Sequence, residues 1–100
     1  MWIKAGKVSD IVEGKSQIAN ANGKEIALFK VDGKVYALEN TCPHRGGPLG
    51  EGYLEGSEVT CPWHAWTFDV KTGVCQTMPD MKQPTFPVKI EADDIFVEVK

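Results

Sequence analysis

Short runs of apolar residues with the composition of β-strands occupy both ends of the chain. Three runs rich in Val, Ile, Leu, Phe and Tyr lie at 15–21, 25–31 and 34–39. The dipeptides Asn22-Gly23 and Asp32-Gly33 separate these runs. Both dipeptides favour two-residue hairpin turns, because both turn positions require a positive φ. The pattern therefore predicts a three-stranded antiparallel meander.

A second hairpin is predicted near the C-terminus. Two further runs, 87–91 and 95–99, flank a turn at Ala92-Asp93-Asp94. Alternate residues from Ile95 to Val99 are apolar, so they should share one face of a strand. No stretch of helical length keeps an apolar stripe with a 3.6-residue period, and any helix should therefore be a single turn. The pattern predicts an all-β fold.

The middle of the chain has a different composition. All six prolines lie between 43 and 87, and seven of the fourteen residues in 43–56 are Gly or Pro. Ordering so much irregular backbone costs conformational entropy, which must be offset by some other interaction. Every Cys and His of the chain also lies in this region, between 42 and 75. These features predict a metal centre that holds the loops in place.

Composition limits the classes of protein to consider. The chain has 100 residues, enough for one domain, which we expect to span 1–100. Its net charge of −3 lacks the basic excess of a nucleic-acid binder. The longest apolar runs, such as 26–29, have four residues, far fewer than the ~20 that cross a membrane. Residues 1–7 contain no apolar core of a signal peptide, so we expect a cytoplasmic protein without membrane contact.

The candidate ligands form two short mixed motifs. Cys42-x-His44 is followed after sixteen residues by Cys61-x-x-His64, so each motif offers one thiolate and one imidazole. Three cysteines in total are too few for an all-cysteine iron–sulfur site, which needs four thiolates. This pattern, together with the flanking meander and the closing hairpin, resembles the Rieske [2Fe–2S] family, and in particular its small soluble ferredoxins.

The resemblance implies both a fold and a ligand set. The fold would be a Rieske fold, with an antiparallel β-sandwich or barrel-like base and a loop-rich cluster-binding insert at about 41–85. Cys42 and Cys61 would bind the inner iron of one [2Fe–2S] cluster, and His44 and His64 would bind the outer iron. Such a protein transfers electrons and has no catalytic residues of its own.

The resemblance also implies a low reduction potential. High-potential members of the family carry a disulfide between their two ligand loops, and here those positions match Gly47 and Trp63. Those members also donate hydroxyl hydrogen bonds to the cluster, from positions that match Trp66 and Phe68 here. With fewer donors, the more negative reduced state is less stabilised. A third loop, at 78–81, matches the proline-bearing loop that covers the cluster in this family.

The expected role is that of a mobile, monomeric electron carrier. In such ferredoxins a flavin-dependent reductase supplies electrons one at a time, and a terminal oxygenase that hydroxylates aromatic rings receives them. The alternative is a fixed Rieske subunit, like the small subunit of an assimilatory nitrite reductase. The chain cannot be the oxygenase itself, because a mononuclear iron site would need two more histidines and a carboxylate.

Two other kinds of site use the same residue types. A structural zinc site often has two Cys and two His, but its pairs run Cys-x₂₋₄-Cys and His-x₃₋₅-His, whereas both pairs here are mixed. A Cys–His nucleophilic site would leave the second pair without a role. The remaining thiol, Cys75, is predicted to be a small buried strand residue and not a ligand.

Overall fold

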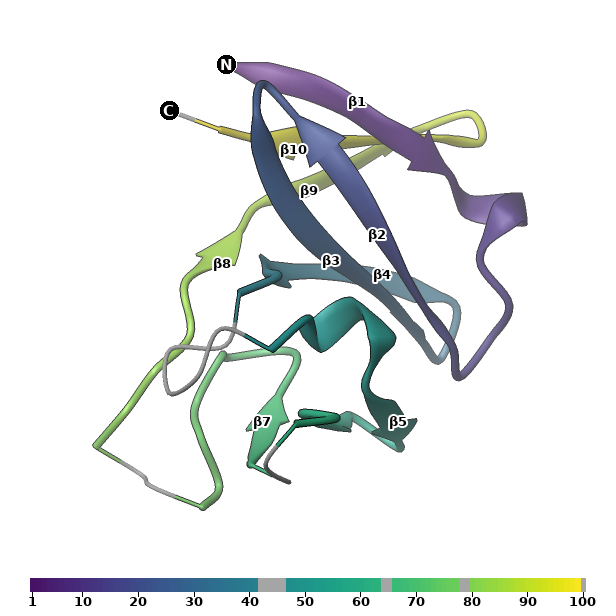
Figure 1. Ribbon diagram of the computed structural model, residues 1–100. Coiled ribbons are helices and arrows are strands. Elements are labelled where there is room, and N and C mark those ends of the chain that lie inside the picture. Colours follow the sequence, from purple (N-terminus) through teal and green to yellow (C-terminus); the bar gives the residue numbers. More distant parts are fainter. Residues whose placement is uncertain (42–46, 64–65, 78–79, 100) are drawn as a thin grey trace.

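The computed structural model of this protein describes residues 1–41, 47–63, 66–77 and 80–99. Within these ranges the helical segments are two 3₁₀ turns, η1 (Val8–Asp10) and η2 (Leu49–Glu51), and neither could span a membrane. The strands are β1 (Trp2–Lys7), β2 (Ser16–Ala21), β3 (Lys24–Val31), β4 (Lys34–Glu39), β5 (Tyr53–Glu55), β6 (Glu58–Thr60), β7 (Thr67–Asp69), β8 (Thr85–Phe86), β9 (Val88–Glu91) and β10 (Asp94–Glu98). They form three antiparallel sheets, ordered β1-β10-β9, β2-β3-β4-β8 and β5-β6-β7 (Figure 1). The predicted all-β class is confirmed.

The predicted meander forms the centre of the second sheet. Strands β2, β3 and β4 pair in sequence, with Ala21 opposite Lys24 and Val31 opposite Lys34. At Asn22-Gly23 the φ angles are 54° and 83°, and at Asp32-Gly33 they are 53° and 77°. Positive φ at both central positions matches the twist of the flanking strands, so both hairpin predictions are confirmed.

The first sheet brings the two ends of the chain together. Strands β9 and β10 form the predicted C-terminal hairpin, with Ala92 of its turn at φ 56°. Strand β1, which the hydrophobic pattern does not predict, pairs along the other edge of β10. The Val99 N–H donates to the Met1 carbonyl (2.8 Å), and the Met1 ammonium donates to the Val99 carbonyl (3.0 Å). Both termini therefore lie side by side.

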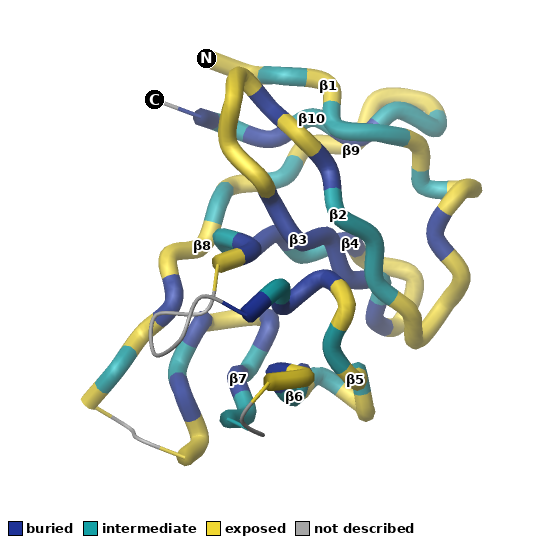
Figure 2. Tube along the Cα trace, viewed as in Figure 1, coloured by how far each residue is buried: buried dark blue, intermediate teal, exposed yellow. Residues whose placement is uncertain are grey.

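Strand β3 lies between two apolar clusters, which explains its uninterrupted apolar run Ile26–Phe29. All four residues of this run are fully buried (Figure 2). Ile26 and Leu28 belong to a cluster with residues of β1 and β10. Ala27 and Phe29 belong to a second cluster with residues of η2, β6 and β7. Successive strand residues point to opposite faces, so a strand covered on both faces needs no polar alternation.

The region predicted to be rich in loops contains the third sheet, β5-β6-β7, and is therefore more regular than expected. Its strands have three residues each, and at the centre of the sheet Val59 pairs with Phe68. Both of these side chains are fully buried in the second apolar cluster. This small sheet is thereby fixed against the underside of the meander, at the end of the molecule opposite the two termini (Figure 1).

Candidate metal centre

The first predicted ligand motif begins directly after β4, in a loop whose two ends are joined. Thr41 and Pro48 form an antiparallel bridge across the base of this loop. Next to the bridge, the carbonyl oxygen of Asn40 accepts a hydrogen bond from the Leu49 N–H (2.8 Å), and its Oδ1 accepts one from the Gly50 N–H (2.7 Å). Asn40 is only 3% exposed. A buried amide thus fixes the place where the loop rejoins the fold.

The second motif lies on the turn between β6 and β7. Thr60 pairs with Thr67, and the Cys61 N–H donates to the Trp66 carbonyl (2.8 Å), which closes the loop. The hairpin therefore holds the Cys61 backbone at the root of the loop. The Cys61 side chain is 1% exposed, whereas Trp63, two residues later, is 63% exposed. The loop buries its thiol and presents an indole ring to solvent.

Gly47 of the first loop packs against the second loop. A Cβ atom on Gly47 would lie 2.7 Å from Sγ of Cys61 and 3.1 Å from Cγ of Trp63. Cβ atoms essentially never come this close to other atoms, so only glycine fits at position 47 without a shift of its neighbours. The two predicted ligand loops are thus in direct contact at Gly47 and Cys61. This close approach suits a thiolate that must reach a metal shared by both loops.

A third loop closes beside the second. Phe68 of β7 forms a bridge with Cys75, and the Cys75 N–H donates to the Met81 carbonyl (3.1 Å). A further bridge joins Val74 to Lys82. Cys75 is fully buried in the apolar cluster around Phe68, where the sequence predicts a small strand residue.

Gln83 connects the third loop to the first. Its side chain is 1% exposed, and its Nε2 donates to the carbonyls of Glu39 and Thr41, at 2.6 Å each. Neither Gln83 nor Asn40 is predicted from the sequence. Neither residue belongs to a periodic run, and a lone amide next to Pro or Thr gives no sign that it will be buried. Only the tertiary structure identifies these two side chains as anchors of the loop.

The structure describes one of the four predicted ligands. Cys61 is placed as described above, whereas Cys42, His44 and His64 lie outside the described residues. Among residues 1–41, 47–63, 66–77 and 80–99, no group of three or more His, Cys, Asp or Glu could hold a metal ion. The described part of the chain therefore offers no rival to the predicted centre.

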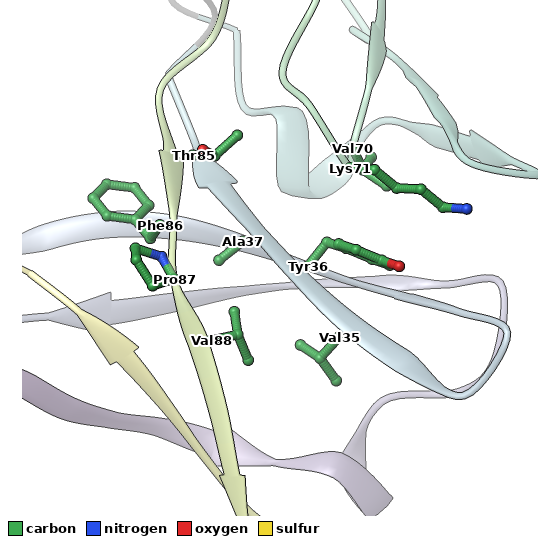
Figure 3. Close-up of a pocket in the computed structure, with 9 residues that line it drawn as sticks. All are labelled: Val35, Tyr36, Ala37, Val70, Lys71, Thr85, Phe86, Pro87 and Val88. Atoms are coloured by element: carbon green, nitrogen blue, oxygen red, sulfur yellow. The ribbon is translucent and has the colours of Figure 1, made fainter.

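A separate cavity of about 430 Å³ lies between β4, the turn after β7 and the segment from Thr85 to Val88 (Figure 3). Apolar side chains line most of it, and Tyr36 and Lys71 lie along one side, with the Lys71 ammonium 6.0 Å from the centre of the Tyr36 ring. The lining contains no Cys or His, so this cavity lacks the thiolates and imidazoles that the predicted centre requires. It is not the predicted centre.

Comparison with known proteins supports the same centre. A model of the Rieske [2Fe-2S] domain matches residues 1–91. The chain is 41% identical, over 98% of its length and 95% of the relative, to the ferredoxin component of the naphthalene 1,2-dioxygenase system of Pseudomonas putida. It is 46% identical, over 90% of its length and 88% of the relative, to the ferredoxin component of the naphthalene 1,2-dioxygenase/salicylate 5-hydroxylase systems of Ralstonia sp..

A solved structure extends this likeness to three dimensions. The structure is a complex of reduced oxygenase and oxidized ferredoxin in carbazole 1,9a-dioxygenase, and the fold matches a chain of that complex with a TM-score of 0.88. That chain is 32% identical to this one, and the match covers 96% of this chain and 91% of that one. The protein therefore belongs to the Rieske [2Fe–2S] domain family, as its ligand motifs predict, and its cofactor is one [2Fe–2S] cluster.

Proposed function

We propose that this protein is the mobile ferredoxin of a dioxygenase system that hydroxylates aromatic rings. It would accept single electrons from a flavin-dependent reductase and deliver them to a terminal oxygenase. The observation that carries this proposal is the contact of Gly47 with the buried thiol of Cys61, beside the exposed ring of Trp63. Its relatives are ferredoxin components of such systems, and one solved neighbour is in complex with its oxygenase.

The ligands in this proposal are Cys42 and Cys61 for the inner iron, and His44 and His64 for the outer iron. Two ferric ions and two sulfides carry a charge of +2, and two thiolates and two neutral imidazoles bring the site to zero. When bound, such a centre takes up and releases one electron at a time. The fit is supported by the chain itself, because Cys61 is buried and the backbone at Gly47 leaves room for its sulfur.

Further properties follow from the same proposal. The chain would form one domain over 1–100, with the cluster-binding part at about 41–85. It would be a cytoplasmic monomer that contacts neither membrane nor nucleic acid. The exposed Trp63 supports a docking role for the cluster end, since brief redox encounters need a short electron-transfer distance more than a large interface.

The proposal is tested by reconstitution. Protein purified from iron-replete cells should contain about two iron and two acid-labile sulfide per chain. Mixed with the reductase and oxygenase of a naphthalene dioxygenase system, it should support product formation, whereas the near-isosteric variant Cys61→Ser should not. Stoichiometric zinc without sulfide would refute the cluster. Purification in fixed stoichiometry with a large reductase, without electron delivery to any oxygenase, would favour the subunit alternative instead.

A further inference from the structure

We propose that Gln83 is a positioning residue for the cluster, which it serves by holding the first ligand loop at a fixed distance from the other two. This inference rests on the proposed function, because it assumes that the three loops enclose the [2Fe–2S] centre. Gln83 is buried, lies outside both ligand motifs and follows the third loop.

The orientation of the Gln83 amide is determined by its neighbours. Both neighbours of Nε2, at 2.6 Å, are carbonyl oxygens, so the side that faces them must be the NH₂ group. One hydrogen reaches the Glu39 carbonyl at the end of β4, and the other reaches the Thr41 carbonyl. Thr41 directly precedes the predicted ligand Cys42. The side chain therefore holds the residue from which the first ligand loop departs.

The backbone of Gln83 is fixed to a different part of the site. Its N–H donates to the carbonyl of Gly73 (2.7 Å), in the turn that follows β7. A Cβ atom on Gly73 would lie 2.2 Å from the Gln83 carbonyl oxygen, so these two backbones are in tight contact. Strand β7 leads back to the second ligand loop. Gln83 thus joins the root of the first loop to the support of the second.

The amide oxygen of Gln83 shows that this arrangement lowers the stability of the fold. Gln83 Oε1 is the one buried side-chain oxygen or nitrogen in the described part of the chain that has no hydrogen-bond partner. An unpaired buried acceptor lowers stability, and an apolar side chain of the same shape would avoid that loss. A glutamine at this position is therefore better explained by its two donors than by packing.

Outer groups that orient ligands usually affect metal retention strongly. Removing such a group typically costs 10–100-fold in metal affinity or activity. For the holo-protein, we therefore expect Gln83→Met to lose its cluster to a chelator about tenfold faster than the wild type. We also expect altered g values in the electron paramagnetic resonance spectrum of the reduced cluster, because the loops would shift against each other.

Val97→Ala is the matched control. Val97 is fully buried in β10, in the apolar cluster at the other end of the molecule, so its truncation lowers stability without touching the loops. It should keep the wild-type g values. Should Gln83→Met retain the wild-type spectrum, and lose its cluster no faster than Val97→Ala at equal thermal stability, the positioning role is refuted.

A second variant covers the case in which Gln83→Met fails to fold. Gln83→Asn keeps a side-chain amide, but the side chain is one methylene shorter, so its NH₂ group cannot reach both carbonyls. It should show the same changes in spectrum and cluster loss, and a wild-type result would again refute the role. A wild-type protein without any cluster would instead refute the proposed function, and the two failures are thereby distinguished.

Discussion

Gly47 packs directly against the thiol of Cys61, so the absence of a side chain in one predicted ligand loop makes room for the sulfur of the other. Any larger residue at position 47 must displace a neighbouring side chain, since its Cβ would lie only 2.7 Å from Sγ of Cys61. The contact joins the loop between β4 and η2 to the turn of the β6–β7 hairpin, fourteen positions later in the sequence. It therefore provides a direct test of the site.

We expect Gly47→Ala to lower the iron and sulfide content of the purified protein while leaving the far-ultraviolet circular dichroism spectrum unchanged. The β-sheets do not depend on this loop contact, whereas the position of Cys61 does. Gly56→Asn is the control, because nothing lies within 4 Å of its Cβ and asparagine tolerates the φ of 61°. Full cluster content in Gly47→Ala would show that cluster binding does not depend on the close contact between position 47 and Cys61.

The reduction potential should lie in the lower half of the Rieske range, between about −150 and 0 mV. Gly47 and Trp63 are in contact, yet they cannot form the disulfide that links the ligand loops of high-potential relatives. Phe68 is fully buried and has no hydroxyl to donate. Protein-film voltammetry measures the potential, and Phe68→Tyr should raise it, because a hydroxyl donor favours the more negative reduced state. A wild-type value well above 0 mV would contradict this account.

Replacing Asn40 should destabilise the fold. Asn40→Ala leaves the Gly50 N–H, which now donates to Oδ1 at 2.7 Å, without an acceptor in a buried setting. The expected loss is about 1–3 kcal/mol in the free energy of unfolding, measured by urea denaturation of the holo-protein. Asn20→Ala is the control, since its amide accepts a comparable hydrogen bond from Gly23 in an exposed turn. Equal losses in the two variants would argue against Asn40 as a buried anchor.

Trp63 should contribute to docking with the oxygenase. Trp63 is 63% exposed, and its ring lies next to the loop contact at Gly47, so Trp63→Ala should weaken docking about tenfold, or ~1.4 kcal/mol. The cluster spectrum should stay unchanged. Trp2→Ala is the control, because Trp2 is also partly exposed but lies on the sheet at the opposite end of the molecule (Figure 1). Stopped-flow measurement of electron transfer distinguishes the two, and equal rates for both variants would exclude Trp63 from the interface.

The sequence predicts those parts of the fold that are determined by residues close together in the chain. The turns at Asn22-Gly23 and Asp32-Gly33 need positive φ angles that few residues tolerate, so the meander between them can be placed to within one residue. Strand β1 could not be predicted in this way. Its residues are mostly exposed or half-buried, and the strand forms because it pairs with β10, more than eighty residues later.

The same distinction applies to the site. The clustered Cys and His residues predict a metal centre, and their spacing carries the resemblance to the Rieske family, which implies the cofactor. The supports of the loops, Asn40 and Gln83, depend on which carbonyl and N–H groups the folded chain brings near them. No property of an isolated amide residue in the sequence reveals those neighbours.

The pairing of Met1 with Val99 also has a practical consequence for handling the protein. Met1 and Val99 lie together on the sheet farthest from the predicted ligand loops (Figure 1). A tether at the C-terminus would therefore attach the molecule to an electrode with its redox end facing the solution. A short linker between the ends would close the chain into a ring, and a new opening at the exposed Asn22-Gly23 turn would give a circular permutant with the cluster loops undisturbed.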